Sequence, residues 1–212
     1  MPAPDRMLAF FLAATVIILI PGPSVLFVIG RALSHGRTAA LASVLGNAVA
    51  CAVVLVLVVL GLGTIVQSSQ VAFTVLKIVG AAYLVWLGVQ ALRNRDGLSP
   101  DVVTGQEQAL LTGWQAGRQG LLVGLSNPKV YLMFAALLPQ FVAPAAAPVQ
   151  VQMLVLGAVM VIIGLVSDSV WVVAASRLRE VLTRTPRRRR AVTGTGGVLM
   201  IGLGGWLAVS RA

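Results

Sequence analysis

The chain has 212 residues, of which 58% are hydrophobic and only 10% are charged. A soluble domain carries about 25% charged residues, so this composition predicts an integral membrane protein. The net charge of +10 does not indicate nucleic-acid binding, because the basic residues stand between apolar runs, where they set membrane topology.

Six apolar runs are long enough to cross about 30 Å of hydrocarbon, which takes about 20 helical residues. We expect these spans at Met7–Gly30, Ala39–Val66, Val71–Leu92, Gly120–Val142, Met153–Ser176 and Val192–Ser210. No long polar block separates them, so the sequence predicts one transmembrane domain over residues 1–212. The expected fold class is an all-α integral membrane protein with six transmembrane helices.

Two of the six runs contain helix-breaking residues. Pro21, Gly22 and Pro23 interrupt the first run, and Asn127 and Pro128 interrupt the fourth. Proline removes a backbone donor and breaks a helix, while irregular backbone at bilayer depth is tolerated only where protein or a polar cavity surrounds it. The sequence therefore predicts two broken transmembrane helices with a binding site between them.

The basic residues predict the orientation. Most lysines and arginines lie in the first, third and fifth connections, whereas the second and fourth connections contain none. The first connection holds Arg31 and Arg37, the third is the long stretch Arg93–Gln119, and the fifth includes Arg187–Arg190. By the positive-inside rule these connections are cytoplasmic, and both termini are expected outside the cytoplasm.

This orientation gives the two halves of the chain opposite topology. Each half opens with a broken helix, which is the pattern of an inverted repeat with a ligand site between its halves. The first repeat is expected over about residues 7–92 and the second over about 120–210, joined by the cytoplasmic connection 93–119.

A layer of polar residues is predicted near the middle of the membrane. At about 1.5 Å per helical residue, Pro21–Pro23, Asn47, Asn127–Lys129 and Asp168 all lie roughly 12 to 15 Å from the inner boundary. Residues at one depth on different helices can meet, so this layer is the expected binding site.

Asp168 is the only carboxylate inside a predicted span. A charge there costs at least about 2.5 kcal/mol, so the group must be paired, protonated or hydrated. One interpretation is a proton carrier, and the other is a permanent ion pair with Lys129 that only joins the fourth and fifth spans. Lys129 itself either attracts a substrate carboxylate or serves as counter-ion or helix-end partner.

Glycines predict close helix packing in two places. Gly113, Gly117, Gly120 and Gly124 share one helical face, which favours the approach of another backbone. The last span is similarly rich in glycine, which suits either packing within the chain or contact with a second copy.

No enzyme or cofactor motif is present. The sequence contains no HExxH, no GxxxxGK[ST], no paired carboxylates and no plausible Ser/His/Asp set, and Cys51 is its single cysteine. We therefore predict a protein that is not an enzyme, with no cofactor and no metal site. Without a P-loop, uphill transport must draw on an ion gradient or a partner.

Several motifs resemble those of the LysE/RhtB family of amino-acid exporters. They are Pro21-Gly22-Pro23 with Gly36, Arg37 and Gly46; the block Leu76–Gly88 with Lys77, Gly80, Ala81, Tyr83 and Leu84; Gly124 with Asn127-Pro128-Lys129; Pro139-Gln140-Phe141; and Asp168 with Trp171. The chain departs from the family pattern at Ile20, where threonine is usual, and at Ala50-Cys51, where the family often has glycine and a polar residue.

This resemblance implies a six-span protein of the bacterial inner membrane, often dimeric, that exports amino acids or related small metabolites in exchange for protons. The expected partners are such a substrate, protons and membrane lipid, with a possible homodimer. An uncoupled channel or a membrane scaffold of the same fold is the alternative. The predicted proton-coupling residue is Asp168, and the predicted substrate-binding residues are Pro21, Gly22, Pro23, Ser24, Asn47, Asn127, Pro128 and Lys129.

Overall fold

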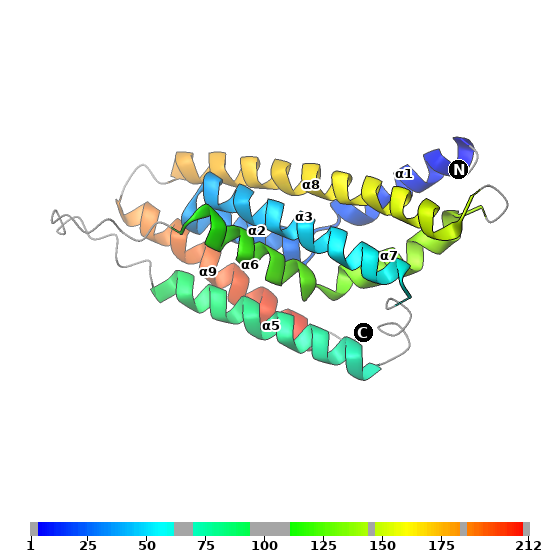
Figure 1. Cartoon of the computed structure of the whole chain (residues 1–212). Coiled ribbons are helices and arrows are strands. Elements are labelled where there is room, and N and C mark those ends of the chain that lie inside the picture. The colour runs from blue at the N-terminus through cyan, green and yellow to red at the C-terminus, as the bar shows by residue number, and fades with distance from the viewer. Residues whose placement is uncertain (1–3, 62–69, 94–110, 144–146, 183–185, 210–212) are drawn as a thin grey trace.

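The structure is a computed structural model that describes residues 4–61, 70–93, 111–143, 147–182 and 186–209. All regular structure in these residues is α-helical. The eight helices of these ranges lie side by side along one long axis (Figure 1). They are α1 (Pro4–Leu19), α2 (Pro23–His35), α3 (Arg37–Val59), α5 (Gln70–Arg93), α6 (Gly113–Leu125), α7 (Pro128–Phe141), α8 (Val149–Leu182) and α9 (Pro186–Val209).

The described helices are long and apolar enough for a protein that crosses the membrane several times. Arg37–Val59, Thr74–Arg93 and Val149–Val181 each qualify as a single span. The pairs α1/α2 and α6/α7 qualify as two further spans, bent by 51° and 55° at short breaks. The predicted breaks are therefore confirmed, while six spans and an inverted repeat stay predictions.

Two predicted boundaries differ from the structure. The predicted connection 93–119 extends to Gln119, but α6 already begins at Gly113 because Thr112 and Gln115 form a capping box there. In addition, α8 has 34 residues and extends beyond the predicted span at both ends. Polar residues such as Gln150 and Arg177 continue a helix as well as apolar ones, so hydropathy places the membrane boundary rather than the end of the helix.

The two breaks have the same local construction. Gly22 is the N-cap of α2 and Pro23 its first helical residue, while Asn127 and Pro128 occupy those positions in α7. Proline suits the first helical position because the amide hydrogen it lacks would have no intrahelical partner there. Each break therefore ends one helix and starts the next within a few residues.

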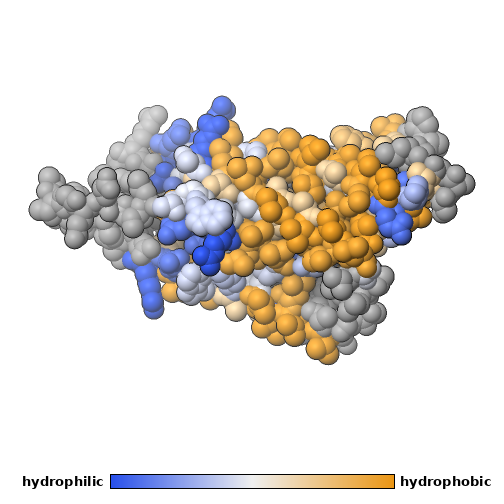
Figure 2. Space-filling model, viewed as in Figure 1, coloured by the Kyte–Doolittle hydropathy of each residue, from blue (hydrophilic) through white to orange (hydrophobic). Residues whose placement is uncertain are grey.

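The described arginines of the predicted first, third and fifth connections lie near helix ends at one end of the bundle, which we call the basic end. Here α2, α5 and α8 end and α3, α6 and α9 begin, on the left of Figure 1. At the opposite end, the terminal end, α1 begins and α9 ends. Figure 2 shows a broad apolar surface between these two more polar ends, as expected for a protein surrounded by lipid.

Glycine allows α3 and α6 to touch through their backbones. A Cβ added to Gly46 would lie 1.9 Å from the Gly117 carbonyl oxygen, and one added to Gly120 would lie 2.0 Å from that of Ser43. The predicted packing face of α6 is confirmed at Gly117, Gly120 and Gly124, whereas a Cβ at Gly113 would meet nothing within 4 Å. In α9, Gly196, Gly197 and Gly204 pack against α2 and α5 in the same way.

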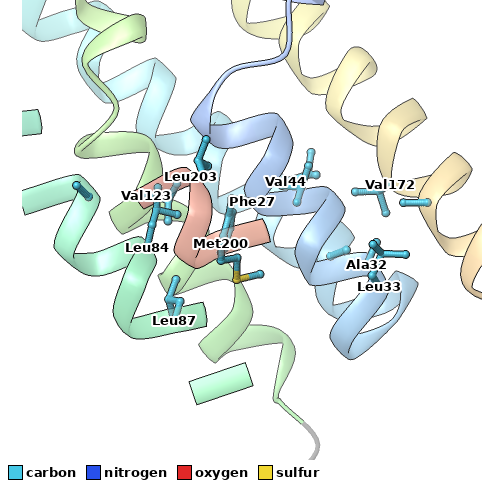
Figure 3. Close-up of a cluster of buried hydrophobic side chains, with 14 residues drawn as sticks. Phe27, Ala32, Leu33, Val44, Leu84, Leu87, Val123, Val172, Met200 and Leu203 are labelled. Carbon is cyan, nitrogen blue, oxygen red and sulfur yellow. The ribbon is translucent and has the colours of Figure 1, made fainter. Parts of the chain in front are cut away.

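Two hydrophobic clusters fill the bundle. The basic-end cluster joins α2, the first half of α3, α5, α6, the second half of α8 and α9 around Phe27, Leu84 and Met200 (Figure 3). The terminal-end cluster joins α1, the second half of α3, α7 and the first half of α8 around Phe10, Phe134 and Met160. The two helix breaks lie between the clusters.

Candidate functional site

Four buried polar side chains form a continuous chain of hydrogen bonds, which we call the polar chain. The Asn127 amide nitrogen donates to Ser24 Oγ at 2.8 Å, and Ser24 Oγ donates to Asn47 Oδ1 at 3.0 Å. The Asn47 amide nitrogen then donates to Asp168 Oδ2 at 3.0 Å. The polar chain thus connects both helix breaks to the single buried carboxylate of the described residues.

Helix geometry places each member of the polar chain. Ser24 is the second residue of α2, so the first break holds its hydroxyl between the two halves of the bundle. Asn127 caps α7, and its Oδ1 accepts the Lys129 amide, which leaves its own amide nitrogen to donate to Ser24. Asn47 and Asp168 project from the unbroken helices α3 and α8. Asn47, Asn127 and Asp168, which the sequence predicts at one depth, are therefore joined by hydrogen bonds through Ser24.

Lys129 has a structural partner other than Asp168. Its ammonium donates to the carbonyl oxygens of Ile17 at 3.0 Å and Ile20 at 2.6 Å, where α1 ends at the first break. Gly22 leaves room for this side chain, because a Cβ there would lie 3.0 Å from Lys129 Cδ. Among the described side chains, no ion pair joins Lys129 to Asp168, so the geometry favours the helix-end role for Lys129 over the permanent pair.

A pocket with an empty volume of about 590 Å³, including its open part, surrounds the polar chain. Six predicted site residues line it, namely Gly22, Ser24, Asn47, Asn127, Lys129 and Asp168. Three others do not: Pro21 is exposed, while Pro23 and Pro128 are buried without reaching the pocket. Pro23 and Pro128 start helices, whereas Pro21 lies in the break itself, and a proline ring without an amide hydrogen has little to offer a polar ligand.

The apolar wall of the pocket was not predicted from the sequence. It includes Cys51, Met133, Phe134, Met160 and Gly164, among other residues. A helical pattern could have located part of it, since Cys51 lies one turn from Asn47 and Gly164 and Met160 lie one and two turns before Asp168. On α7, Met133 likewise lies one turn after Lys129, so the same pattern marks that side of the pocket.

The chemical groups of the described site are few. Within the ranges that the structure describes, no group of three or more histidine, cysteine or acidic side chains could hold a metal ion. The polar groups that line the pocket are one carboxylate, one ammonium, two side-chain amides and one hydroxyl, together with the first turns of two helices. This arrangement suits a small molecule that carries both an amine and an acid.

Comparison with known proteins gives a consistent result. A family model described as LysE type translocator matches residues 15–211. An uncharacterized membrane protein of Vibrio cholerae is 34% identical, with 97% of each chain covered. The homoserine/homoserine lactone efflux protein of Salmonella typhimurium is 32% identical over 96% of each chain. The leucine efflux protein of Klebsiella pneumoniae is 28% identical over 97% of this chain and 95% of its own. No solved structure gives a significant match.

Proposed function

The chain belongs to the LysE type translocator family, and we propose that it is a secondary exporter of amino acids or related small metabolites in the bacterial inner membrane. Members of this family are transporters rather than enzymes. The observation that carries the proposal is the polar chain, which brings both helix breaks and Asp168 together inside one pocket.

The pocket has complementary places for the two charged groups of an amino acid. Gly22, the N-cap of α2, provides no side-chain cap, so the first amides of α2 are available to a carboxylate. Gly22, Ser24 and Val25 of this segment all line the pocket. The substrate amine would bind Asp168, which already accepts one hydrogen bond from Asn47 and has further acceptor capacity.

The remaining wall favours an uncharged side chain. Met133, Phe134, Met160 and Val161 form a largely apolar surface beside the polar chain. Burial of a charged side chain against this surface would lose hydration without a partner. The names of the similar efflux proteins include homoserine and leucine, two amino acids whose side chains carry no charge.

Asp168 would couple export to proton entry. A carboxylate that is 5% exposed at membrane depth binds either a proton or a substrate amine more readily than it stays unpaired. Protonation on one side and release on the other would therefore alternate with binding of the substrate. Such competition for a single acceptor is sufficient for antiport.

We place this site in a fold of six spans arranged as two inverted repeats, with both termini outside the cytoplasm. The similar cap-and-proline start of α2 and α7 and the bends of 51° and 55° support the repeat. The basic end would face the cytoplasm according to the positive-inside rule. Rocking of one repeat against the other would then expose the pocket to each side in turn.

The test is gradient-driven transport by purified protein in proteoliposomes. Radiolabelled L-leucine, L-homoserine and L-lysine are supplied separately with an imposed pH gradient. We expect saturable, gradient-dependent transport of at least one neutral amino acid. Asp168→Asn should remove the dependence on the gradient, while Glu180→Gln, which changes an exposed carboxylate of the same helix, should not.

Two outcomes would contradict the proposal. Flux that neither saturates nor responds to the gradient would indicate an uncoupled channel. No transport of any amino acid by correctly folded protein would favour a membrane scaffold. Retention of full gradient dependence in Asp168→Asn would refute only the role of this carboxylate.

A further inference from the structure

A buried arginine near the basic end has no role in the site described above. The sequence places Arg31 in the first connection, but the residue lies inside α2 and is only 2% exposed. It follows Ser24 by seven residues, which is two helical turns, so both side chains lie on about the same face of α2. Arg31 is therefore about 10 Å from the polar chain along the helix, toward the basic end.

The guanidinium of Arg31 has only neutral partners. One terminal nitrogen, Nη2, donates to the side-chain oxygen of Gln119 on α6, and the guanidinium carbon lies 5.1 Å from the centre of the Phe27 ring. Its Nε is buried and has no acceptor. No carboxylate among the described side chains forms an ion pair with it. Buried arginines are normally paired with an anion, so this one has an unused capacity for one.

Gln119 is as far along its helix from the second break as Arg31 is from the first. It precedes Ser126, the C-cap of α6, by seven residues, so the contact between Arg31 and Gln119 lies two turns from both breaks. An amide oxygen is a weaker acceptor for guanidinium than a carboxylate is. A carboxylate that reached this point could therefore displace Gln119 and also satisfy Nε.

We propose that Arg31 and Gln119 form a carboxylate-binding station between α2 and α6, which the substrate occupies on its way from the basic end to the polar chain. In the present conformation the station is closed, because Arg31 is buried and its guanidinium lies over the ring of Phe27, a member of the basic-end cluster. Separation of α2 from α6 would break the Arg31–Gln119 hydrogen bond and expose the guanidinium. This inference rests on the proposed function, since it assigns a place to the exported amino acid.

The test compares transport from the two faces of the membrane. Uptake of radiolabelled L-leucine, or of L-homoserine if the wild type moves that instead, is measured in inverted vesicles, where the cytoplasmic face is outside. Counterflow in right-side-out vesicles reports on the opposite face. We expect Arg31→Gln to raise the half-saturating concentration roughly tenfold in inverted vesicles only, which corresponds to loss of one charge-assisted interaction. Arg31→Lys should restore part of the affinity.

Gln119→Glu distinguishes a carboxylate-binding role of the Arg31–Gln119 contact from a role that only stabilises the fold. The new carboxylate would pair permanently with Arg31, compete with the substrate and raise the same half-saturating concentration, while it stabilises the folded protein. Arg31→Gln would weaken binding of the substrate carboxylate without this gain in stability. The two variants should thus act in the same direction on transport, while only Gln119→Glu raises the thermal stability. Arg37→Gln is the matched control, because this arginine is exposed at the start of α3.

Three results would overturn the inference. They are an equal effect of Arg31→Gln at both faces, no effect at either face, or a lowered half-saturating concentration in Gln119→Glu. Wild-type vesicles that move no amino acid would refute the proposed function itself, and the station with it.

Discussion

The basic-end and terminal-end halves of the molecule are held together in different ways. At the basic end, glycines such as Gly46, Gly120 and Gly30 bring neighbouring backbones into direct contact. At the terminal end, contact is made by large side chains, for example Phe10, whose ring meets Phe141 edge-on at 5.3 Å. A backbone contact changes only if a whole helix moves, whereas side chains can adjust by changing rotamer. The terminal-end half should therefore adapt more easily.

The pocket lies on the adaptable side. Ile18, Val130, Phe134 and Met160 belong both to the terminal-end cluster and to the pocket wall, whereas the basic-end cluster contributes Val44 and, at its edge, Leu165. Methionine and phenylalanine beside a ligand can repack around different shapes. This contrast indicates that the basic-end half is a rigid frame, whose helices move only as whole bodies when the repeats rock, and that the terminal-end half accommodates the substrate by side-chain repacking.

The largest effect should come from a large side chain placed where two helix backbones touch in the rigid half. Gly120→Leu would force α3 and α6 apart, because even a Cβ there would lie 2.0 Å from the Ser43 carbonyl oxygen. We expect little or no folded protein, measured as the yield of a single peak in size-exclusion chromatography. Gly202→Leu is the control, since a Cβ at Gly202 meets nothing within 4 Å. Normal yield of Gly120→Leu would disprove the rigid-frame description.

The same substitution in the pocket should affect transport alone. A Cβ at Gly164 would meet nothing within 4 Å, so Gly164→Leu can extend into the pocket without displacing a helix. We expect normal yield and thermal stability, with at least about a tenfold loss of transport rate in proteoliposomes. If Gly164→Leu failed to fold, the space beside Asp168 would be part of the packing rather than a binding site.

A smaller difference is expected in the accessibility of thiols. Cys51 lines the pocket, whereas Ala40 is completely buried in the basic-end cluster. A small thiol reagent should therefore modify Cys51 about ten times faster than it modifies the thiol introduced by the double substitution Ala40→Cys/Cys51→Ala, as measured by mass spectrometry of the intact protein. A transported amino acid should slow the reaction at Cys51 only. Equal rates would show that the pocket is no more open than the cluster.

The smallest effect concerns the end of α1. Lys129→Met would remove the ammonium that donates to the carbonyl oxygens of Ile17 and Ile20. Loss of a hydrogen bond from a partly exposed charged donor lowers the free energy of unfolding by about 1 to 2 kcal/mol. We expect a lower thermal unfolding temperature with transport reduced but present, and partial recovery in Lys129→Arg. Unchanged stability together with complete loss of transport would instead indicate that Lys129 binds the substrate directly.

Much of the site could be predicted from the sequence because its signals are local. A proline lacks an amide hydrogen wherever it stands, so Pro23 and Pro128 predict helix breaks without any knowledge of their neighbours. A lone carboxylate in an apolar run, such as Asp168, is costly in any membrane fold. Residue depth then predicts that Pro23, Asn47 and Asn127 lie at about the level of Asp168, since a helix rises by a constant amount per residue.

Other features depend on contacts between distant segments. Depth alone allowed Lys129 to meet Asp168, and only the packing of α7 against the end of α1 directs its ammonium to Ile17 and Ile20. Arg31 resembles a topology signal by its position, yet the turn of α2 places it inside the bundle against Phe27 and Gln119. The apolar pocket wall likewise combines residues from five helices, α1, α2, α3, α7 and α8.

The sequence by itself thus determined that the chain enters the membrane, where two helices break and which carboxylate is buried, because hydration and backbone chemistry belong to each residue alone. The tertiary structure decided which donors and acceptors meet, and which half of the bundle adjusts around the pocket. Those outcomes depend on the direction in which each side chain projects from its helix and on the distance between helix axes. Both quantities are set only when all the helices pack together.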